Sequence, residues 1–345
     1  MAYTTINKSG DYFNTKLYTG NGSTSHTISG VGFEAGLTWI KGRNFTSSHH
    51  TIDQVRGGTK NIMPDNTGAE QSDNMINSWN SDGFNLNNYS EVNSNTNTFV
   101  AWNWKANGQG SANTDGSINT IYTSVNTTSG CSIVKYTGTG SVGTIGHGLG
   151  AVPKMIIIKD LGDTNNWQVY HASIGNTKWL ELNTTSAEQT NVSRWNNTSP
   201  TSSVFTVGTT GSVNASGINN IAYCFAEKQG YSKFGSYIGN SNANGAFIYT
   251  GFKPAFVIIK RTSSAGDDWV MFDNKRSTSG KNVIDKRLNP NSSGAEQSGD
   301  KIDFLSNGFK CIGTTDDMNG NGSTYIYMAF GQSLVGSNNI PNNAR

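Results

Sequence analysis

The chain of 345 residues is poor in charge: 14% of its residues are charged, 34% are hydrophobic, and the formal net charge is +2. An average globular protein has about 25% charged residues, and here glycine (41 residues), asparagine, serine and threonine make up the difference. These residues favour turns and strands, which argues against a helical bundle or a doubly wound α/β enzyme. Aromatic residues make up 10% of the chain, with 8 tryptophans, so we expect a packed core rather than disorder.

Composition also argues against several partners and cofactors. Lysine and arginine are scattered singly, without the basic patch of a nucleic-acid-binding protein. No run of apolar residues is long enough to suggest membrane insertion, and residues 1–8 lack the apolar core of a secretion signal. We expect no metal, disulfide or cofactor, because the cysteines are odd in number and widely spaced: Cys131, Cys224 and Cys311.

Three sequence markers recur in the same order three times. They are a Tyr-x-Gly turn (residues 18–20, 136–138 and 237–239), an apolar strand ending in Ile-Lys (Lys41, Lys159 and Lys260), and Ala-Glu-Gln (Glu70, Glu188 and Glu296). The tyrosine precedes the lysine by 23 positions in every copy. Such spacing predicts a threefold tandem repeat.

Each copy ends in a segment with large apolar residues at alternate positions, which predicts a strand with one face on a core. These residues are Val100, Trp102 and Trp104, then Ile221, Tyr223 and Phe225, then Ile326, Met328 and Phe330. The Ile-Lys strands are apolar on both faces and are expected to be central. Asp82-Gly83 and Asn307-Gly308 predict hairpins that copy two lacks.

The predicted fold is all-β, with three tandem β-sandwiches of jelly-roll or concanavalin A-like type. The markers and the composition of the joints divide the chain into an N-terminal arm (1–16), repeat 1 (17–106), a linker with a strand near 117–125 (107–130), repeat 2 (131–228), repeat 3 (229–332) and a C-terminal tail (333–345).

No catalytic, cofactor-binding or metal-binding residue is predicted. The glycine-rich residues 138–143 match a dinucleotide-binding fingerprint but lack the helix that must follow it. His49 and His50 are adjacent, would point to opposite faces of a strand, and are expected in a surface loop. Asp267-Asp268 and Asp316-Asp317 are expected to be solvated acids in turns. The protein is therefore not expected to be an enzyme.

The recurrent glutamates and lysines allow two interpretations. Glu70, Glu188 and Glu296 could bind a cation or a sugar hydroxyl, or could form structural ion pairs with Lys41, Lys159 and Lys260. Recurrence in every copy favours the structural role. Asp53 and Arg56 also match Asp273 and Arg276, but copy two has His171 in place of the aspartate, so a site needing both residues would be absent there.

Four tryptophans stand among polar residues rather than on a predicted core face. They are either exposed stacking platforms for sugar rings or residues at the edge of a core. These residues are Trp79, Trp167, Trp195 and Trp269.

Several of these segments resemble the tandem repeats of virion proteins from tailed bacteriophages, mostly marine ones. The resemblance covers about residues 10–332 and is carried by the Val-Ala-Trp-Asn-Trp-Lys end of copy one, by Tyr325–Phe330, and by residues 222–235, Ala-Tyr-Cys-Phe-Ala-Glu-Lys-Gln-Gly-Tyr-Ser-Lys-Phe-Gly. It implies lectin-like, concanavalin A-like β-sandwiches and a place on the phage particle. It implies no catalytic or binding residue.

Three functions follow as hypotheses. The first is a non-enzymatic virion structural protein, a decoration or fibre-type module docked on capsid or tail proteins through residues 1–16 or the tail from Leu334. It would be assembled in the host cytoplasm and carried as a homo-oligomer or in many copies, and three similar units would suit pseudo-threefold positions of the particle. The second is an adhesin that binds host surface glycans, and the third is a polysaccharide hydrolase.

Overall fold

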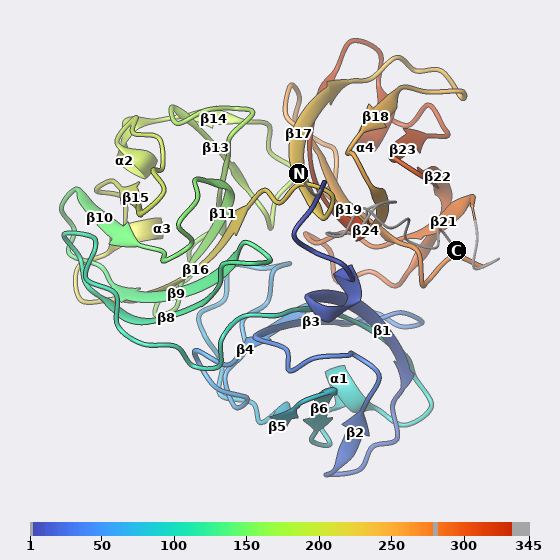
Figure 1. Ribbon diagram of the computed structural model, residues 1–345. Helices are drawn as coiled ribbons and strands as arrows, with labels where there is room; N and C mark the ends of the chain where they lie inside the picture. The colour runs from blue at the N-terminus through green and yellow to red at the C-terminus, as the bar shows by residue number, and fades with distance from the viewer. Residues whose placement is uncertain (1–2, 279–281, 333–345) are drawn as a thin grey trace.

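The computed structural model describes residues 3–278 and 282–332, and this part of the chain is all-β, with 42% strand and 6% helix. The strands form antiparallel sheets in three consecutive stretches of chain, which we call segment 1 (residues 13–104), segment 2 (131–226) and segment 3 (232–332). Figure 1 shows the three segments around a common centre, with segment 1 in blue and cyan, segment 2 in green and yellow, and segment 3 in orange and red.

One sheet in each segment has the same strand order, and we call these the inner sheets. The orders are β1-β7-β3-β4, β9-β16-β11-β12 and β17-β24-β19-β20. In segment 1 the strands are β1 (Phe13–Thr19), β3 (Leu37–Gly42), β4 (His50–Asp53) and β7 (Thr98–Trp104). Segment 2 has β9 (Cys131–Thr137), β11 (Pro153–Asp160), β12 (Gln168–His171) and β16 (Asn219–Ala226). Segment 3 has β17 (Ser232–Ile238), β19 (Lys253–Arg261), β20 (Val270–Asp273) and β24 (Thr324–Gln332).

A second, outer sheet accompanies each inner sheet. In segment 1 it is β2-β6-β5, formed by β2 (His26–Ile28), β5 (Ile76–Asn80) and β6 (Gly83–Leu86). In segment 3 it is β18-β23-β22-β21, formed by β18 (Phe247–Tyr249), β21 (Ile284–Arg287), β22 (Gln297–Leu305) and β23 (Gly308–Cys311). Segment 2 has only β10 (Gly143–Gly146) and β15 (Val204–Val207) there; its inner sheet is extended by β8 (Thr120–Asn126), β13 (Lys178–Glu181) and β14 (Gln189–Thr190).

The hairpins expected from Asp82-Gly83 and Asn307-Gly308 are present as β5-β6 and β22-β23. In segment 2 a short helix, α2 (Val192–Trp195), precedes β15, and β15 pairs with β10 alone. The different turn expected for copy two is therefore confirmed. The strand expected near 117–125 is β8, which pairs with β9.

The strands at the ends of the three segments are buried on both faces, not on one. The large residues that the sequence places on a core face lie in one central cluster shared by all three segments. The alternate residues, such as Phe99, Cys224 and Tyr327, lie in three local clusters that contain side chains from both sheets of one segment. Each local cluster therefore joins the inner and outer sheets of one segment. Each fully buried aromatic or aliphatic side chain contributes about 1.5–3 kcal/mol to folding.

Three equivalent aromatic residues meet at the molecular centre. Ring centroids are 6.2 Å apart for Trp104 and Phe225, and 5.9 Å apart for both Trp104–Phe330 and Phe225–Phe330. All three side chains are at most 2% exposed. The large residues at alternate positions of each final strand therefore form a core that all three segments share.

The Tyr-x-Gly marker holds a short helix before each final strand. These helices are α1 (Ser90–Asn93), α3 (Gly211–Asn214) and α4 (Asp316–Asn319). The tyrosine hydroxyl donates to a helix carbonyl in every segment: Tyr18 to Val92, Tyr136 to Val213 and Tyr237 to Met318, at 2.5–2.7 Å. A Cβ on the glycine would lie 2.1–2.4 Å from a carbonyl oxygen in Gly20, Gly138 and Gly239, so no larger residue fits there.

The N-terminal arm packs on the molecule itself. The Tyr3 hydroxyl donates to the carbonyl of Gly251, the amide of Ser9 donates to Gln332 Oε1, and Ile6 is buried in the central cluster. A 3-10 helix (Ser9–Asp11) precedes β1, which begins inside the range assigned to the arm. The tail assigned to 333–345 lies outside the described residues.

Candidate functional site: the joints and clefts between segments

The repeated glutamates lie at the joints between segments. In each case the backbone amide donates to a carbonyl two positions after a repeated lysine of another segment. The bonds are Glu70 N to Leu161 O (3.0 Å), Glu188 N to Thr262 O (3.0 Å) and Glu296 N to Arg43 O (2.8 Å). Segment 1 thus binds segment 2, segment 2 binds segment 3, and segment 3 binds segment 1. We call these joint 1–2, joint 2–3 and joint 3–1; together they close a ring.

The repeated lysines are fully buried but do not pair with the repeated glutamates, so that predicted ion pair is wrong. Their ammonium groups donate to backbone carbonyls: Lys41 to Gly42 and Ser293, Lys159 to Asp160 and Asp163, and Lys260 to Asp267 and Thr185. Two of these carbonyls, those of Ser293 and Thr185, belong to a neighbouring segment. Burial lowers the pKa of each lysine to about 8.

The glutamate side chains find other cations. Glu70 lies 3.4 Å from Arg56, and Glu188 pairs with Lys178 in its own segment. Glu296 instead receives two bonds from Arg43 of segment 1, at 2.9 and 3.0 Å, and one from Arg276 at 3.2 Å.

A ring N–H crosses each joint as well. The three donors hold the same position, eight or nine residues after the repeated lysine, and each binds a carbonyl of the preceding segment in the ring. These bonds are Trp167 Nε1 to Met63 O (3.0 Å), Trp269 Nε1 to Glu181 O (2.9 Å) and His49 Nε2 to Asn289 O (3.1 Å). The indole of Trp39 donates to His49 Nδ1, so this histidine is neutral with its proton on Nε2. Burial holds its pKa well below the usual range.

Three of the four tryptophans are buried, so of their two interpretations the exposed stacking platform is excluded for these three. Trp167 and Trp269 are each 1% exposed because another segment covers them, and Trp195 is 2% exposed, with its indole donating to the carbonyl of Lys178. Trp79, on β5, is half-buried, and its indole nitrogen has no partner among the described residues.

The type of buried polar residue at each joint matches the hydrogen-bonding group that the neighbouring segment presents. At joint 1–2, Asp53 accepts from the Tyr223 hydroxyl (2.8 Å) and pairs with Arg56 (2.7 Å). At joint 3–1, Asp273 accepts from the Trp102 indole (3.0 Å) and pairs with Arg276.

Joint 2–3 lacks such a donor, because the residue equivalent to Tyr223 and Trp102 is Met328. Here His171 replaces the aspartate and bonds to the carbonyl of Tyr327 (3.2 Å), and Ile174 replaces the arginine. The substitution avoids a buried carboxylate without a donor, which would be costly.

The remaining candidates are engaged within the fold. Residues 138–143 join β9 to β10, and no helix follows them. His49 and His50 are both buried, so the predicted surface loop is wrong; His50 binds Glu91 at 2.6 Å. Asp267 and Asp317 are ion-paired with Arg261 and Arg287 and are not fully solvated, contrary to the expectation for these turns. Within residues 3–278 and 282–332, no group of three or more His, Cys, Asp or Glu side chains is arranged to hold a metal ion.

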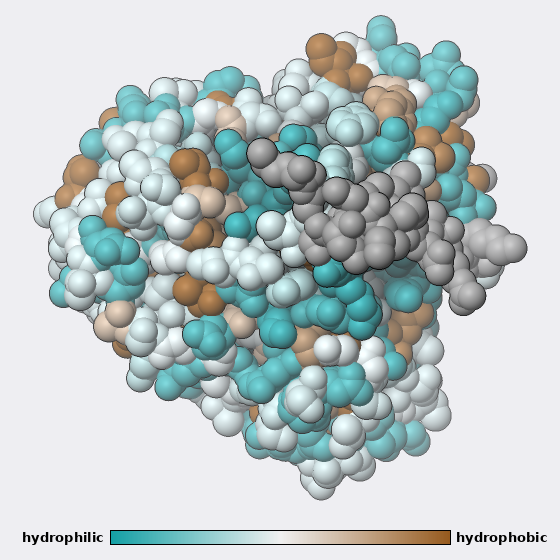
Figure 2. Space-filling view, in the orientation of Figure 1, coloured by the Kyte–Doolittle hydropathy of each residue, from teal (hydrophilic) through white to brown (hydrophobic). Residues whose placement is uncertain are grey.

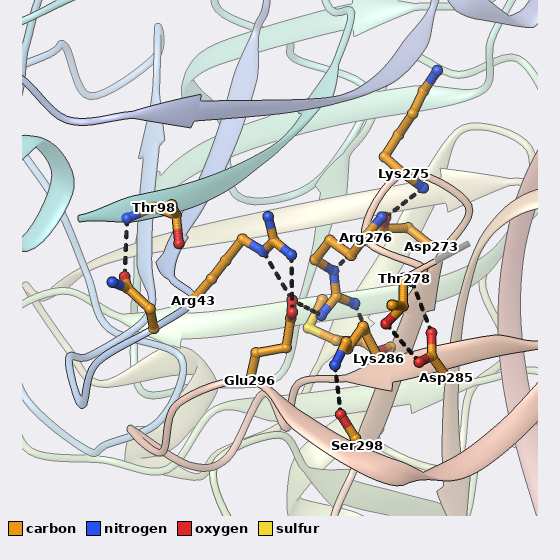
Figure 3. A network of polar contacts seen from close by, with 12 residues as sticks. Arg43, Thr98, Asp273, Lys275, Arg276, Thr278, Asp285, Lys286, Glu296 and Ser298 are labelled. Atoms are coloured by element: carbon orange, nitrogen blue, oxygen red, sulfur yellow. Dashed lines mark hydrogen bonds and ion pairs between the residues drawn. The ribbon is translucent and has the colours of Figure 1, made fainter. Parts of the chain in front are cut away.

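A cleft opens at each joint, and the repeated glutamate lines all three. Cleft 3–1 has a volume of about 620 Å³, cleft 2–3 about 260 Å³ and cleft 1–2 about 240 Å³. Cleft 3–1 is lined by four basic residues and one acid, whereas each of the others has one lysine and one glutamate. Figure 3 shows this network, in which Arg43 and Arg276 converge on Glu296 while the side chain of Lys275 points away.

Two sets of residues in these features were not identified from the sequence. The first is the basic lining of cleft 3–1, since Arg43 and Lys275 are far apart in the chain and occur in only one copy. The second is a buried asparagine seven residues before the first residue of each final strand that faces the central cluster, which is Val100, Ile221 or Ile326: Asn93, Asn214 and Asn319. Each accepts a hydrogen bond from a backbone amide next to the Tyr-x-Gly turn. Its constant spacing from the final strand could have identified it from the sequence.

No helix in the described part of the chain has the length and apolar character needed to cross a membrane. No curated protein matches the chain. Residues 8–333 match a family described as a domain of unknown function, DUF7483. Because this match spans nearly the whole sequence, including all three segments and their joints, the chain belongs to the DUF7483 family.

Proposed function

We propose that the protein is a non-enzymatic structural component of a bacteriophage virion, built from three tandem concanavalin A-like β-sandwiches. The observation that carries the proposal is the ring of equivalent joints. The polar residues that recur in every copy are used to bind one segment to the next. A body held in this way is suited to a rigid part of a particle, and its pseudo-threefold form suits a threefold or pseudo-threefold position.

The resemblance to virion proteins supports the same role, and the surface offers a docking element. On the edge strand β18, Phe247 and Tyr249 point outward and are 47% and 60% exposed. The visible face in Figure 2 is otherwise mostly polar, with small scattered apolar patches. An exposed aromatic pair on an unpaired strand edge is suited to contact with a neighbouring protein. Since residues 3–9 are bound to segment 3, we place docking on β18 rather than on the arm.

Imaging of intact particles tests this proposal. We expect an antibody against the protein to label purified virions at regularly repeated positions of the head or tail. Label confined to the unassembled fraction of the lysate would overturn the proposal. The variant Phe247→Ser with Tyr249→Ser should incorporate poorly, whereas Val142→Ser with Val192→Ser, which also removes two exposed apolar residues, should incorporate normally.

Glycan binding is a second candidate function, and the half-buried Trp79 favours it. Its indole nitrogen is itself buried, so a sugar would contact the exposed part of the ring by stacking. Trp79→Ala, which removes the ring, should abolish binding on an array of host glycans if this side chain stacks on a sugar. Unchanged binding, or no binding by the unmodified protein, would remove the candidate. We propose no hydrolase mechanism, because the aspartate pairs considered for it have structural partners.

A further inference from the structure

Cleft 3–1 has more positive charge than its own ion pairs use. Its lining contains Arg43, Lys275, Arg276 and Lys286 against the single carboxylate of Glu296. Both guanidinium groups share that carboxylate, and the buried Arg276 is also neutralised by Asp273. The Lys286 ammonium donates to the hydroxyl of Ser298 at 2.6 Å, so Arg43, Lys275 and Lys286 outnumber the remaining carboxylate. The exposed Lys275 forms no ion pair with any residue that the structure describes (Figure 3). The cleft therefore presents a net positive surface to solvent.

The joint does not need all of this charge, because the other two joints are built without it. The position of Arg43 is held by Leu161 and Thr262 in the other segments, and that of Lys275 by Val55 and Ser173. Those joints keep the same glutamate amide bond and the same ring N–H bond. Arg43 and Lys275 are thus additions peculiar to one of three equivalent clefts.

The rest of the lining is suited to a hydroxylated ligand. Asn44 and Thr98 place amide and hydroxyl groups around the cations, and Leu17 supplies a small apolar surface. The hydroxyl of Thr278, which also lines the cleft, donates to Asp285 at 2.7 Å. The volume of about 620 Å³ falls within the range of about 300–1,000 Å³ that is usual for small-molecule sites. Arginine and lysine side chains form strong, charge-assisted hydrogen bonds with carboxylates.

We propose that cleft 3–1 binds an acidic oligosaccharide, with sugar carboxylates near Lys275 and Arg43 and sugar hydroxyls near Asn44 and Thr98. Cleft 2–3 has the same position in the fold but carries hydroxyl groups from Ser173 and Thr262 where cleft 3–1 has these two cations. It serves as an internal comparison. The inference does not depend on a place in the virion.

Calorimetric titration of the full chain with trigalacturonate tests the proposal, with maltotriose as the neutral trisaccharide and inorganic phosphate as the sugar-free anion. We expect trigalacturonate to bind and the other two to bind at least tenfold more weakly. Binding should weaken from 0.1 M to 1 M NaCl, as the Debye length falls from about 10 Å to about 3 Å. Lys275→Ser should weaken binding about fivefold.

Lys135→Ser is the matched control, because it removes one lysine from cleft 1–2 and changes the net charge equally. It should leave trigalacturonate affinity unchanged. Equal losses in the two variants would show a nonspecific charge effect and overturn the site. Equal affinity for maltotriose would refute the need for charge, and equal affinity for phosphate would refute recognition of the sugar. Failure of trigalacturonate to bind would also overturn the proposal, without bearing on virion assembly.

Discussion

The polar groups buried at the joints are matched residue by residue across the segments. Asp53 faces a tyrosine hydroxyl and Asp273 faces an indole N–H, whereas His171 stands where the neighbour offers only a thioether and a carbonyl. A buried carboxylate without a donor would be strongly destabilising. The residue at this position is therefore matched to the group that the neighbouring segment offers, and it does not simply repeat the residue found in the other segments.

Removal of the Tyr223 hydroxyl tests this matching. Tyr223→Phe keeps the ring in the central cluster but deprives Asp53 of one donor and Arg56 of one acceptor. We expect the free energy of unfolding, measured with urea, to fall by about 1–3 kcal/mol. Tyr231→Phe is the control, because the buried Tyr231 hydroxyl has no partner among the described residues, and it should cost nothing. Equal losses in the two variants would contradict the assigned bond.

His171 makes stability depend on pH in a predictable direction. Burial lowers its pKa to about 4, against about 6.5 in an unfolded chain. Between these values the unfolded state binds a proton that the folded state does not, so the stability present above pH 6.5 is lost as the pH falls toward 4. The full shift corresponds to about 3 kcal/mol.

His171→Gln keeps a donor and an acceptor at this position but does not titrate. Urea unfolding at pH 7 and pH 4.5 should show that the unmodified protein loses about 2 kcal/mol more than the variant over this interval. Parallel losses would mean that His171 is protonated in the folded protein at pH 4.5.

At the scale of single residues, the sequence indicated the kind of residue at each position but not whether its side chain is buried. Trp167 follows two asparagines and Trp269 follows two aspartates, so the local pattern left open whether each is exposed or lies at the edge of a core. Both are buried because a different segment covers them. Their partners Met63 and Glu181 lie about ninety to a hundred positions earlier, and periodicity cannot report contacts at such separations.

At the scale of strands and turns, the local sequence pattern was sufficient to predict where these elements form. The Ile-Lys strands, the final strands, the two hairpins and the strand in the linker all form where the alternation and turn residues indicate. Pattern did not show that the final strands are covered on both sides. Their second face carries small residues such as Ala101, Ala222 and Ala329, which pack under the outer sheet of the same segment.

The glutamate amides offer a direct test of the joints at this scale. Glu70, Glu188 and Glu296 each donate to a carbonyl of another segment, so their amide protons should exchange only when a joint opens. NMR of protein labelled with ¹⁵N-glutamate should show all three strongly protected. Glu34, exposed and without a backbone acceptor in the described part of the chain, should exchange rapidly. Rapid exchange at one of the three would mean an open joint.

At the scale of the whole molecule, the main feature is closure. The three markers predicted three similar units, but no marker shows that the third unit returns to the first. That contact joins residues far apart in the chain: Arg43 and Glu296 are separated by 253 positions. Closure depends on the geometry of the central cluster, where Trp104, Phe225 and Phe330 converge, and only the folded arrangement shows it.

A double-mutant cycle measures this contact. Arg43→Met and Glu296→Gln should each destabilise the protein, and the double variant should lose less than the sum, with a coupling energy of about 1–2 kcal/mol. The same cycle with Arg43 and Glu188, which lie at different joints, should give a coupling below about 0.5 kcal/mol. Coupling equally small in both cycles would indicate that segments 1 and 3 are apart in solution.

Differential scanning calorimetry of the intact chain tests closure most directly. A ring with three equivalent joints and one shared core should unfold as a unit, in a single transition with a ratio of calorimetric to van't Hoff enthalpy of about 1. Three resolved transitions, or a ratio of about 3, would show that the segments unfold independently. That result would contradict the closed ring on which the proposed structural role depends.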